Sequence, residues 1–401
     1  MIHRLFDSEC PVVSLVIHLQ PILSPAGNRL FGYEALLRGV DVDGKQISPL
    51  ALFSAMKTPV ERLALDKEAR VLAVKAFEPY WRKNPKLVLF VNFESSLVEV
   101  FSPEQHSLFD GLLTHYGIPF SNIVLEVKED EVVSNEALQA FCQFYRQLGF
   151  NVALDDFGVG QSSFDRIAII KPDIIKIDRS LMTDIQHNQI HQEVVTAICN
   201  MCQNIGAMAL AEGVETLDES IYALMSGALL MQGYYFAKPT FEPHPNEVVD
   251  KLWALQQAYT QRVQQQQEEA CRLFTLAEQI KQYFLLAMSG VSSVQLWNGI
   301  ANVLLNQFSA IEAIYVVDAQ SCQQIGDTIV RYQVRPLYQP TEAGYDYSLK
   351  EYLIRAKNSL TGNHLTRPYL SLASGNLCRT ASLKLNIYGQ DVFLCIDFNL
   401  A

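Results

Sequence analysis

The sequence predicts an α/β protein with a TIM-like (β/α)₈ barrel, followed by a long connecting helix and a small α+β domain. Three observations support this fold class. Short β-rich runs alternate with longer helical patterns from residue 15 to about 240, and residues 247–289 keep helical spacing without Gly or Pro. The last part of the chain has a helical pattern and then several β-rich runs. The predicted domains are residues 1–243, 244–290 and 291–401.

The barrel is predicted from apolar runs that have the length of strands and are mostly separated by helical patterns. Parallel strands need long crossover connections, which these helices supply. The predicted strands are 15–23, 29–35, 87–93, 122–128, 151–157, 173–178, 207–213 and 229–236. The predicted helices are 59–80, 103–116, 134–148, 187–205 and 217–226. Ser134 and Gly149 are suitable caps for one of these helices, and Arg62, Lys67 and Arg70 are expected to form a solvated face of another.

The remaining elements follow from two changes of pattern. Residues 244–290 include a glutamine run at 264–267 whose neighbours keep helical spacing, so we expect a connecting helix that pairs with a copy of itself in a homodimer. The third domain has a helix near 292–307 and no gathering of catalytic groups. Its predicted strands are 311–317, 328–334, 368–373, 379–388 and 391–398.

Composition excludes several classes of protein. The formal net charge of −12 disfavours binding to duplex nucleic acid, which requires clustered Lys and Arg. No apolar run reaches the length of a membrane-spanning helix, and the first residues lack the apolar stretch of a signal peptide. The eight cysteines are scattered without framework spacing. We therefore expect a cytoplasmic protein with no membrane span.

Oxygen-bearing side chains occur near the ends of separate predicted strands. Such barrels have their active sites at the C-terminal ends of the strands. Carboxylates gathered there repel one another unless a cation lies between them, and Mg²⁺ or Mn²⁺ prefers oxygen ligands. The candidate ligands are Glu34, Asn92, Glu126, Asp155, Asp156 and Glu212.

Taken singly, each candidate has an ordinary structural alternative. These alternatives are a surface carboxylate beside Arg38 for Glu34, a turn residue for Asn92, a strand-to-loop exit for Asp155 and Asp156, and a same-face ion pair for Lys176 and Asp178. Their joint occurrence, one strand end after another, favours a single shared site.

The motifs around these residues resemble those of the EAL family of cyclic-di-GMP phosphodiesterases. The resemblance covers about residues 12–242. The motifs, in order, are Gln20-Pro21-Ile22, Glu34-Ala35-Leu36-Leu37-Arg38, Val91-Asn92-Phe93, Leu125-Glu126-Val127-Lys128-Glu129, Asp155-Asp156-Phe157-Gly158, Lys176-Ile177-Asp178, Glu212-Gly213-Val214-Glu215, Gln232-Gly233-Tyr234-Tyr235-Phe236 and Lys238-Pro239. The arrangement also resembles, more loosely, relatives in which a PAS- or Cache-like domain follows a long helix.

The resemblance implies a site with two metal ions. Glu34, Asn92, Glu126 and Asp155 would hold the first ion, and Asp155 would bridge to a second ion completed by Asp156 and Glu212. The implied cofactors are two Mg²⁺ or Mn²⁺ ions, which clamp the attacking and leaving oxygens. The implied catalytic residues are Lys176, which would hydrogen-bond the nucleophilic water or the phosphate, Glu212 as general base, and Asp156.

The same resemblance implies the residues that contact and support the substrate. Arg38 would reach a phosphate, whereas others would line the guanine and ribose ends. The implied substrate-binding residues are Gln20, Leu36, Arg38, Gln232 and Pro239. The implied supporting residues are Glu129, Asp178 and Glu215.

One loop departs from the family pattern and leaves two functions open. After Gly158 the family usually has Thr or Ala and then, beyond a glycine, an aromatic residue, whereas this chain has Val159 and Gln161. We expect hydrolysis of cyclic-di-GMP to linear pGpG, regulated by the C-terminal domain through an unknown small molecule or protein. The alternative is a weakly active or inactive cyclic-di-GMP receptor that signals through the helix.

Overall fold

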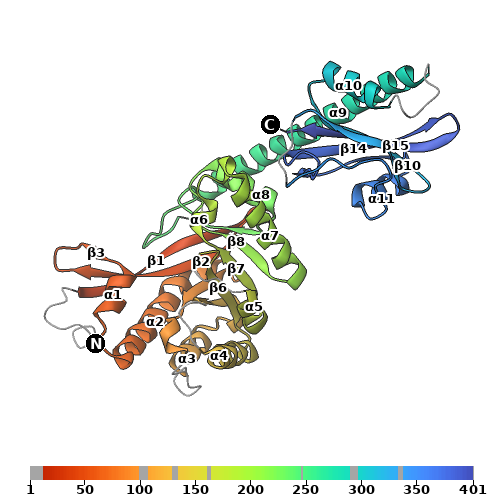
Figure 1. Ribbon diagram of the computed structural model, residues 1–401. Helices are drawn as coiled ribbons and strands as arrows, with labels where there is room; N and C mark the ends of the chain where they lie inside the picture. The colour runs from red at the N-terminus through yellow and green to blue at the C-terminus, as the bar shows by residue number, and fades with distance from the viewer. Residues whose placement is uncertain are drawn as a thin grey trace. The chain divides into compact units, whose positions relative to one another are not determined.

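The structure, a computed structural model, describes residues 12–98, 107–128, 134–159, 164–244, 247–289, 297–332 and 337–400. The chain divides into two compact units, Met1–Arg262 and Val263–Ala401, and Figure 1 labels most of their helices and several of their strands. Within the described ranges no helix combines the length and the apolar character needed to cross a membrane.

The first unit is a closed eight-stranded barrel, as the sequence predicts. Its strands follow the order β1-β9-β8-β7-β6-β5-β4-β2, and the pairing of β1 with β2 closes the ring. A short strand, β3, extends the sheet beside β2. The strands are β1 (Val12–Ser24), β2 (Arg29–Asp41), β3 (Gln46–Ile47), β4 (Val88–Asn92), β5 (Ile123–Lys128), β6 (Asn151–Phe157), β7 (Ile174–Ile177), β8 (Met208–Ala211) and β9 (Leu230–Met231).

The barrel differs from an all-parallel one at β1, which is antiparallel to both of its neighbours. The reason is local, because only the four residues 25–28 separate β1 from β2 and a loop of that length can form a hairpin but not a crossover. Asn28 has φ +44°, a conformation that Asn tolerates better than most residues. The remaining barrel strands pair in parallel.

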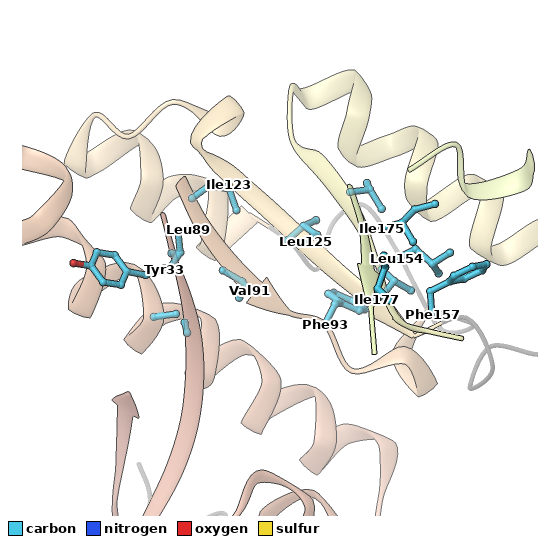
Figure 2. Close-up of a cluster of buried hydrophobic side chains, with 14 of the residues drawn as sticks. Tyr33, Leu89, Val91, Phe93, Ile123, Leu125, Leu154, Phe157, Ile175 and Ile177 are labelled. Atoms are coloured by element: carbon cyan, nitrogen blue, oxygen red, sulfur yellow. The ribbon is translucent and has the colours of Figure 1, made fainter. Parts of the chain in front are cut away.

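Helices cover the outside of the barrel. They are α1 (Pro49–Ala55), α2 (Pro59–Lys83), α3 (Ser107–Tyr116), α4 (Asn135–Leu148), α5 (Phe164–Ile170), α6 (Arg179–Met182), α7 (Gln189–Ile205) and α8 (Leu217–Ser226). Ser134 and Gly149 cap α4 as expected. Alternate strand residues such as Leu89, Leu125 and Ile175 belong to the large buried cluster that also contains helix residues (Figure 2).

The opposite faces of the same strands fill the barrel interior. This inner cluster takes one residue from almost every barrel strand, namely Ile22, Phe90, Val124, Ala153, Ile174, Leu210 and Leu230. The corresponding residue on β2 is Gly32, where an added Cβ would lie 2.0 Å from the Val88 carbonyl oxygen. A side chain therefore has no room there, and the inner layer closes tightly around the axis.

The expected solvated face of α2 is wrong for one of its three residues. Arg70 is 1% exposed, and its Nη2 lies 2.5 Å from Asp66 Oδ2. The guanidinium carbon lies 4.8 Å from the centre of the Phe93 ring. A buried arginine requires a partner of opposite charge, and the adjacent Asp66, one helical turn earlier, supplies it.

The second unit contains most of a long helix and an antiparallel sheet. The sheet order is β11-β10-β15-β14-β12, and β13 pairs with β14. The elements are α9 (Glu247–Met288), α10 (Trp297–Gln307), β10 (Ile311–Asp318), β11 (Gln324–Val330), α11 (Glu351–Asn358), β12 (Asn363–Leu365), β13 (Tyr369–Leu370), β14 (Leu377–Ile387) and β15 (Gln390–Asn399). The helix α9 confirms the predicted helix, whereas α11 and β12 are not among the predicted elements and β11 begins four residues before the predicted start at 328.

The alternation of side chains on β15 shows how this sheet is covered on both faces. Leu394, Ile396 and Phe398 pack with α9 and α10 in one core, and Phe393 and Cys395 pack with α11 in another. Figure 1 shows α10 and α11 on opposite sides of β14 and β15. The start of α9 packs in the first unit instead, through Val248, Leu252 and Leu255.

Candidate active site

One polar residue per barrel strand forms a layer next to the apolar interior. On seven strands the polar residue comes two positions after the inner residue, and on the antiparallel β1 it comes two positions before, so all lie toward the same end of the barrel. This polar layer consists of Gln20, Glu34, Asn92, Glu126, Asp155, Lys176, Glu212 and Gln232. The sequence predicted all eight as site residues, and the structure brings them together.

The β1–β2 hairpin sets one side of this layer. Gln20 lies directly opposite Glu34 in the strand register. Gln232 Nε2 donates hydrogen bonds to Gln20 Oε1 at 2.9 Å and to Glu34 Oε2 at 2.6 Å. Asn92 Nδ2 donates to Glu34 Oε1 at 3.1 Å. Two amide side chains, those of Gln232 and Asn92, therefore hold Glu34 in position, and Gln20 in turn accepts from Gln232.

Lys176 lies at the centre of the carboxylates. Its Nζ is 2.6 Å from Glu126 Oε1, 2.8 Å from both Asp155 Oδ1 and Glu212 Oε1, and 3.6 Å from Glu34 Oε1. The same-face ion pair with Asp178 that the sequence left open is not formed, because Asp178 instead caps α6 by accepting from the Ser180 backbone N–H at 2.7 Å. Lys176 thus balances part of the negative charge of the layer.

Burial and mutual repulsion govern protonation in this layer. Burial raises the pKa of Glu212 to about 8, and the nearby Asp155 and Glu34 act in the same direction against Lys176. Burial likewise raises the pKa of Glu126 well above its ordinary value. Burial disfavours the charged form of Lys176, but the surrounding carboxylates outweigh this and raise its pKa. The carboxylates thus outnumber the one lysine, and burial with mutual repulsion favours the protonated forms of Glu126 and Glu212.

The donor set fits divalent cations. Lys176 contacts one oxygen of each carboxylate, and Glu126 Oε2 is buried without a hydrogen-bond partner in the described part of the chain. Ligand oxygens of Asp155, Asp156 and Glu212 lie within 4.8 Å of one another. Hard oxygen donors of this kind suit Mg²⁺, Mn²⁺ or Ca²⁺.

A bulge allows consecutive residues of β6 to serve one site. The pairing of β6 with β7 shifts register between Leu154 and Phe157, and Asp156 has φ +54°. In a regular strand Asp155 and Asp156 would point to opposite faces, whereas a bulge re-aims one of them. Asp156 also forms an ion pair with Lys128, which sequence reasoning did not assign to the site.

A cavity of about 600 Å³ opens above the polar layer. Its walls include the predicted Leu36 and Glu215, together with an apolar side formed by Pro49, Leu50 and Phe53. Because α1, which supplies these apolar residues, was not among the predicted helices, they could not be assigned. Tyr234, which follows the predicted Gln232 by two positions, also lines the cavity.

Two predicted substrate residues do not line this cavity. Arg38 donates from Nη1 to its neighbour's carbonyl, that of Leu37, at 2.8 Å. Burial lowers the pKa of His18, and the charge of Arg38 lowers it further. A backbone hydrogen bond at Pro239 raises it. Arg38 and Pro239 therefore both lie beside His18. His18 lies opposite Leu36 in the hairpin register. It comes two residues before Gln20 on β1 and therefore lies outside the polar layer.

The supporting residues have separate roles. Glu215 Oε1 pairs with Arg179 Nη2 at 2.8 Å, and Arg179 is a wall residue that the sequence analysis missed. Gly213 has φ +62°, and an added Cβ would lie 2.4 Å from Arg179 Cγ, so this arrangement requires glycine. The predicted Glu129 lies outside the described residues, as does the loop residue Gln161.

An eight-stranded barrel with acidic side chains at the C-terminal ends of its strands defines the class of the first unit. The sequence profile described as EAL domain matches residues 12–239. The chain belongs to the EAL-domain family, whose members here include cyclic-di-GMP phosphodiesterases.

Relatives share either the whole chain or the barrel. The EAL-domain containing protein YkuI of Bacillus subtilis is 26% identical over 395 residues, which is 95% of this chain and 93% of YkuI. The cyclic di-GMP phosphodiesterase PdeR of Escherichia coli is 29% identical over 229 residues, which is 56% of this chain and 34% of PdeR.

Solved structures give the same division. The crystal structure of YkuI with cyclic-di-GMP and calcium has a TM-score of 0.80 at 22% identity and covers 96% of both chains, so the fold of both units is shared. A standalone EAL protein from Vibrio cholerae in its cyclic-di-GMP bound form has a TM-score of 0.51 at 29% identity and covers 57% of this chain and 92% of its own.

Proposed function

We propose that the first unit hydrolyses one phosphodiester bond of cyclic-di-GMP, giving linear pGpG, with two Mg²⁺ or Mn²⁺ ions. The observation that carries the proposal is the polar layer, in which four carboxylates surround Lys176 beneath the cavity. The cavity volume falls in the range of about 300–1,000 Å³ that small-molecule sites occupy. The V. cholerae EAL protein, at 29% identity, binds the same dinucleotide.

The proposed metal ligands are Glu34, Asn92, Glu126, Asp155, Asp156 and Glu212. Bound divalent cations supply positive charge and make a water more acidic. In the proposed reaction the water oxygen forms a bond to phosphorus, the P–O3′ bond breaks, and the 3′ oxygen takes a proton. Glu212 is the proposed acceptor of the water proton, and Lys176 adds positive charge where negative charge develops. Gln20 and Leu36 are proposed to contact the substrate.

A turnover assay on the full chain tests this function. We expect purified protein with Mn²⁺ to convert cyclic-di-GMP to pGpG, as seen by liquid chromatography. Glu34→Ala and Glu212→Gln should abolish the product, whereas Asp43→Asn, at an exposed turn of the same unit, should leave it unchanged. Product formation that persists in both site variants, or binding without turnover under every metal and pH tried, rejects the proposal.

A second function, cyclic-di-GMP binding with little turnover, is favoured by one specific contact. The ion pair between Lys128 and Asp156 engages a proposed ligand of the second metal ion. The altered loop residue Val159 follows three positions later. Two measurements together distinguish the two functions. A receptor binds cyclic-di-GMP tightly in calorimetry with Ca²⁺, and it yields no pGpG in the turnover assay with Mn²⁺.

We further propose that the second unit is a PAS- or Cache-like sensor that regulates the barrel, and that the chain forms a homodimer. A two-sided antiparallel sheet with its own core supports a separate input module. Light scattering gives the oligomeric state, and the rate of residues 1–262 beside that of the full chain gives the regulation. An unchanged rate and oligomeric state in a truncated chain that keeps its circular dichroism spectrum would contradict this role.

A further inference from the structure

A large cavity in the second unit lies outside the site described above. Its volume is about 1,140 Å³, and its walls come from β10, β13, β15, α11 and the segments between 337 and 373. It lies on the α11 side of the sheet, where Tyr315 and Tyr347 belong to the buried cluster. Nothing in the proposed hydrolysis uses this space.

An acidic side chain lies in the cavity wall. Asp397, on the central strand β15, is 2% exposed. Ser371 Oγ donates to its Oδ2 at 3.1 Å and Thr380 Oγ1 to its Oδ1 at 2.7 Å. Within the described ranges no basic side chain forms an ion pair with it. Glu312, 1% exposed and close enough to raise the pKa of Asp397, has an unpartnered Oε2 and adds to the local negative charge.

Tyrosine rings surround this carboxyl group. Tyr315 and Tyr347 stack with ring centres 5.3 Å apart, and Tyr352 and Tyr369 with centres 6.3 Å apart. Tyr315 and Tyr352 are joined through their hydroxyls at 2.8 Å. All four line the cavity. The hydroxyls of Tyr315 and Tyr352 thus satisfy one another, and the four rings share the cavity wall with charged side chains, among them Lys350, Arg355 and Arg367.

We propose that this cavity binds a small organic ammonium ion, with Asp397 as its counter-charge and the tyrosines as an aromatic enclosure. Electron-rich ring faces attract cations, more strongly when water is excluded. A buried carboxylate without a cationic partner is costly, and an ammonium ligand removes that cost on binding. The ammonium group can belong to a quaternary amine, a polyamine or an amino acid, since all three carry it.

The ordinary structural alternative is that Asp397 only connects Ser371 and Thr380. Burial raises the pKa of Asp397 to about 6, so a neutral carboxyl is accessible to it. A purely structural hub, however, does not require a cavity of this size or four tyrosines beside it. The two accounts differ in whether a cation binds.

Thermal-shift and calorimetric titrations of the full chain, without cyclic-di-GMP, test the proposal. The probes are choline, putrescine and L-alanine at millimolar concentrations. The control ligand is 3,3-dimethylbutan-1-ol, which replaces the quaternary nitrogen of choline by carbon. We expect at least one ammonium probe to bind and the neutral alcohol not to bind. The probe that binds shows whether the ammonium group belongs to a quaternary amine, a polyamine or an amino acid.

Variants then locate the site. Asp397→Asn keeps the shape and should weaken binding about tenfold or more, and Tyr352→Leu removes one ring and should also weaken it. Glu342→Gln, at an exposed position of the same unit, should bind as wild type does. If Asp397→Asn does not fold, Tyr352→Phe is compared with Tyr352→Leu instead. The phenylalanine variant keeps the ring and should keep most of the affinity. Binding of none of the three probes to wild type, equal binding of the alcohol, or unchanged affinity in both Asp397→Asn and Tyr352→Leu would overturn the proposal.

Discussion

At the scale of single residues, Lys176 is the cation at the centre of the polar layer. Removing its charge leaves Glu126, Asp155 and Glu212 facing one another. We expect Lys176→Met to lower the free energy of unfolding by about 3–5 kcal/mol without divalent metal, the typical cost of breaking a buried pair. Added Mn²⁺ should restore part of this loss.

Chemical unfolding of the barrel measures the effect. Lys86→Met, at an exposed position just before β4, is the matched control and should change stability little. A Lys176→Met variant as stable as wild type in the presence of a chelator would mean that the carboxylates do not depend on this lysine.

Lys128 competes with a divalent metal ion for the carboxylate of Asp156. The two side chains are 39% and 40% exposed, so their ion pair is a weak one of about 0.2–1 kcal/mol. We expect Lys128→Thr to strengthen Mn²⁺ binding and to raise turnover about two- to fivefold. The reason is that Mn²⁺ then binds Asp156 without first displacing the ammonium group of Lys128. Lys128→Arg keeps the ion pair and should behave as wild type. Equal Mn²⁺ affinity in the threonine and arginine variants would show that the pair does not compete.

The sequence predicts most metal-ligand candidates of the polar layer from strand periodicity, whereas Gln20 and Gln232 were implied by the family resemblance. Five of the six ligand candidates follow an inward-facing residue by two positions, as Asn92 follows Phe90, and Asp156 is the exception. Lys128 was named only as a member of a motif and was given no role. Its role depends on the bulge that turns Asp156, and no local sequence pattern predicts that bulge. Arg38 and Pro239 were placed by resemblance alone, and the structure puts them beside His18.

At the scale of elements, a buried ion pair fastens α2 to the end of β4. Asp66 Oδ1 accepts from the Glu94 backbone N–H at 3.2 Å, two residues after Asn92. Asp66 and Arg70 are nearly inaccessible. We expect Arg70→Met to cost about 3–5 kcal/mol of stability and to lower turnover, because an uncompensated carboxylate then lies beneath the strand that carries Asn92.

A double variant tests whether the pair or its packing matters. Asp66→Leu with Arg70→Met removes both charges and should cost less than Arg70→Met alone. Arg82→Met, on the same helix and 65% exposed, is the control. A double variant that is less stable than Arg70→Met would contradict the electrostatic explanation.

The strand β15 carries a pH-dependent contribution. Burial raises the pKa of Asp397 to about 6 from 3.8. A folded state that holds its proton more tightly than the unfolded state loses stability as pH rises from about 4 to about 6, by at most about 3 kcal/mol. Hydrogen exchange of β14 and β15 in Asp397→Asn should lack this loss. The same pH dependence in both proteins would assign it to another group.

Element prediction succeeded where periodicity is long and failed where tertiary contacts decide. The helix α9 and the barrel strands are long or strongly patterned. The short helix α11 is held by Leu353 and Ala356 against the sheet, and this packing cannot be read from so short a sequence, half of which is polar. The burial of Arg70 could not be predicted, because Phe93 contacts it only in the fold, although Asp66 lies one helical turn away on the same predicted helix.

At the scale of the whole molecule, two units with separate cores each carry one of the two proposed sites. A ligand stabilises the state that binds it, by about 2.7 kcal/mol at a hundredfold excess over its Kd. Ca²⁺ with cyclic-di-GMP should therefore slow hydrogen exchange in β4–β8, and an ammonium ligand should slow it in β10 and β14–β15. Protection that appears only in the other unit would contradict the assignment of the two sites.

The most direct test of the central claim is calorimetric titration of Mn²⁺ into the full chain and into its Glu126→Gln and Asp155→Asn variants. The account predicts binding to wild type and to Asp43→Asn, and its loss in both site variants, because these carboxylates belong to the same layer. Undiminished Mn²⁺ binding in both site variants would contradict it.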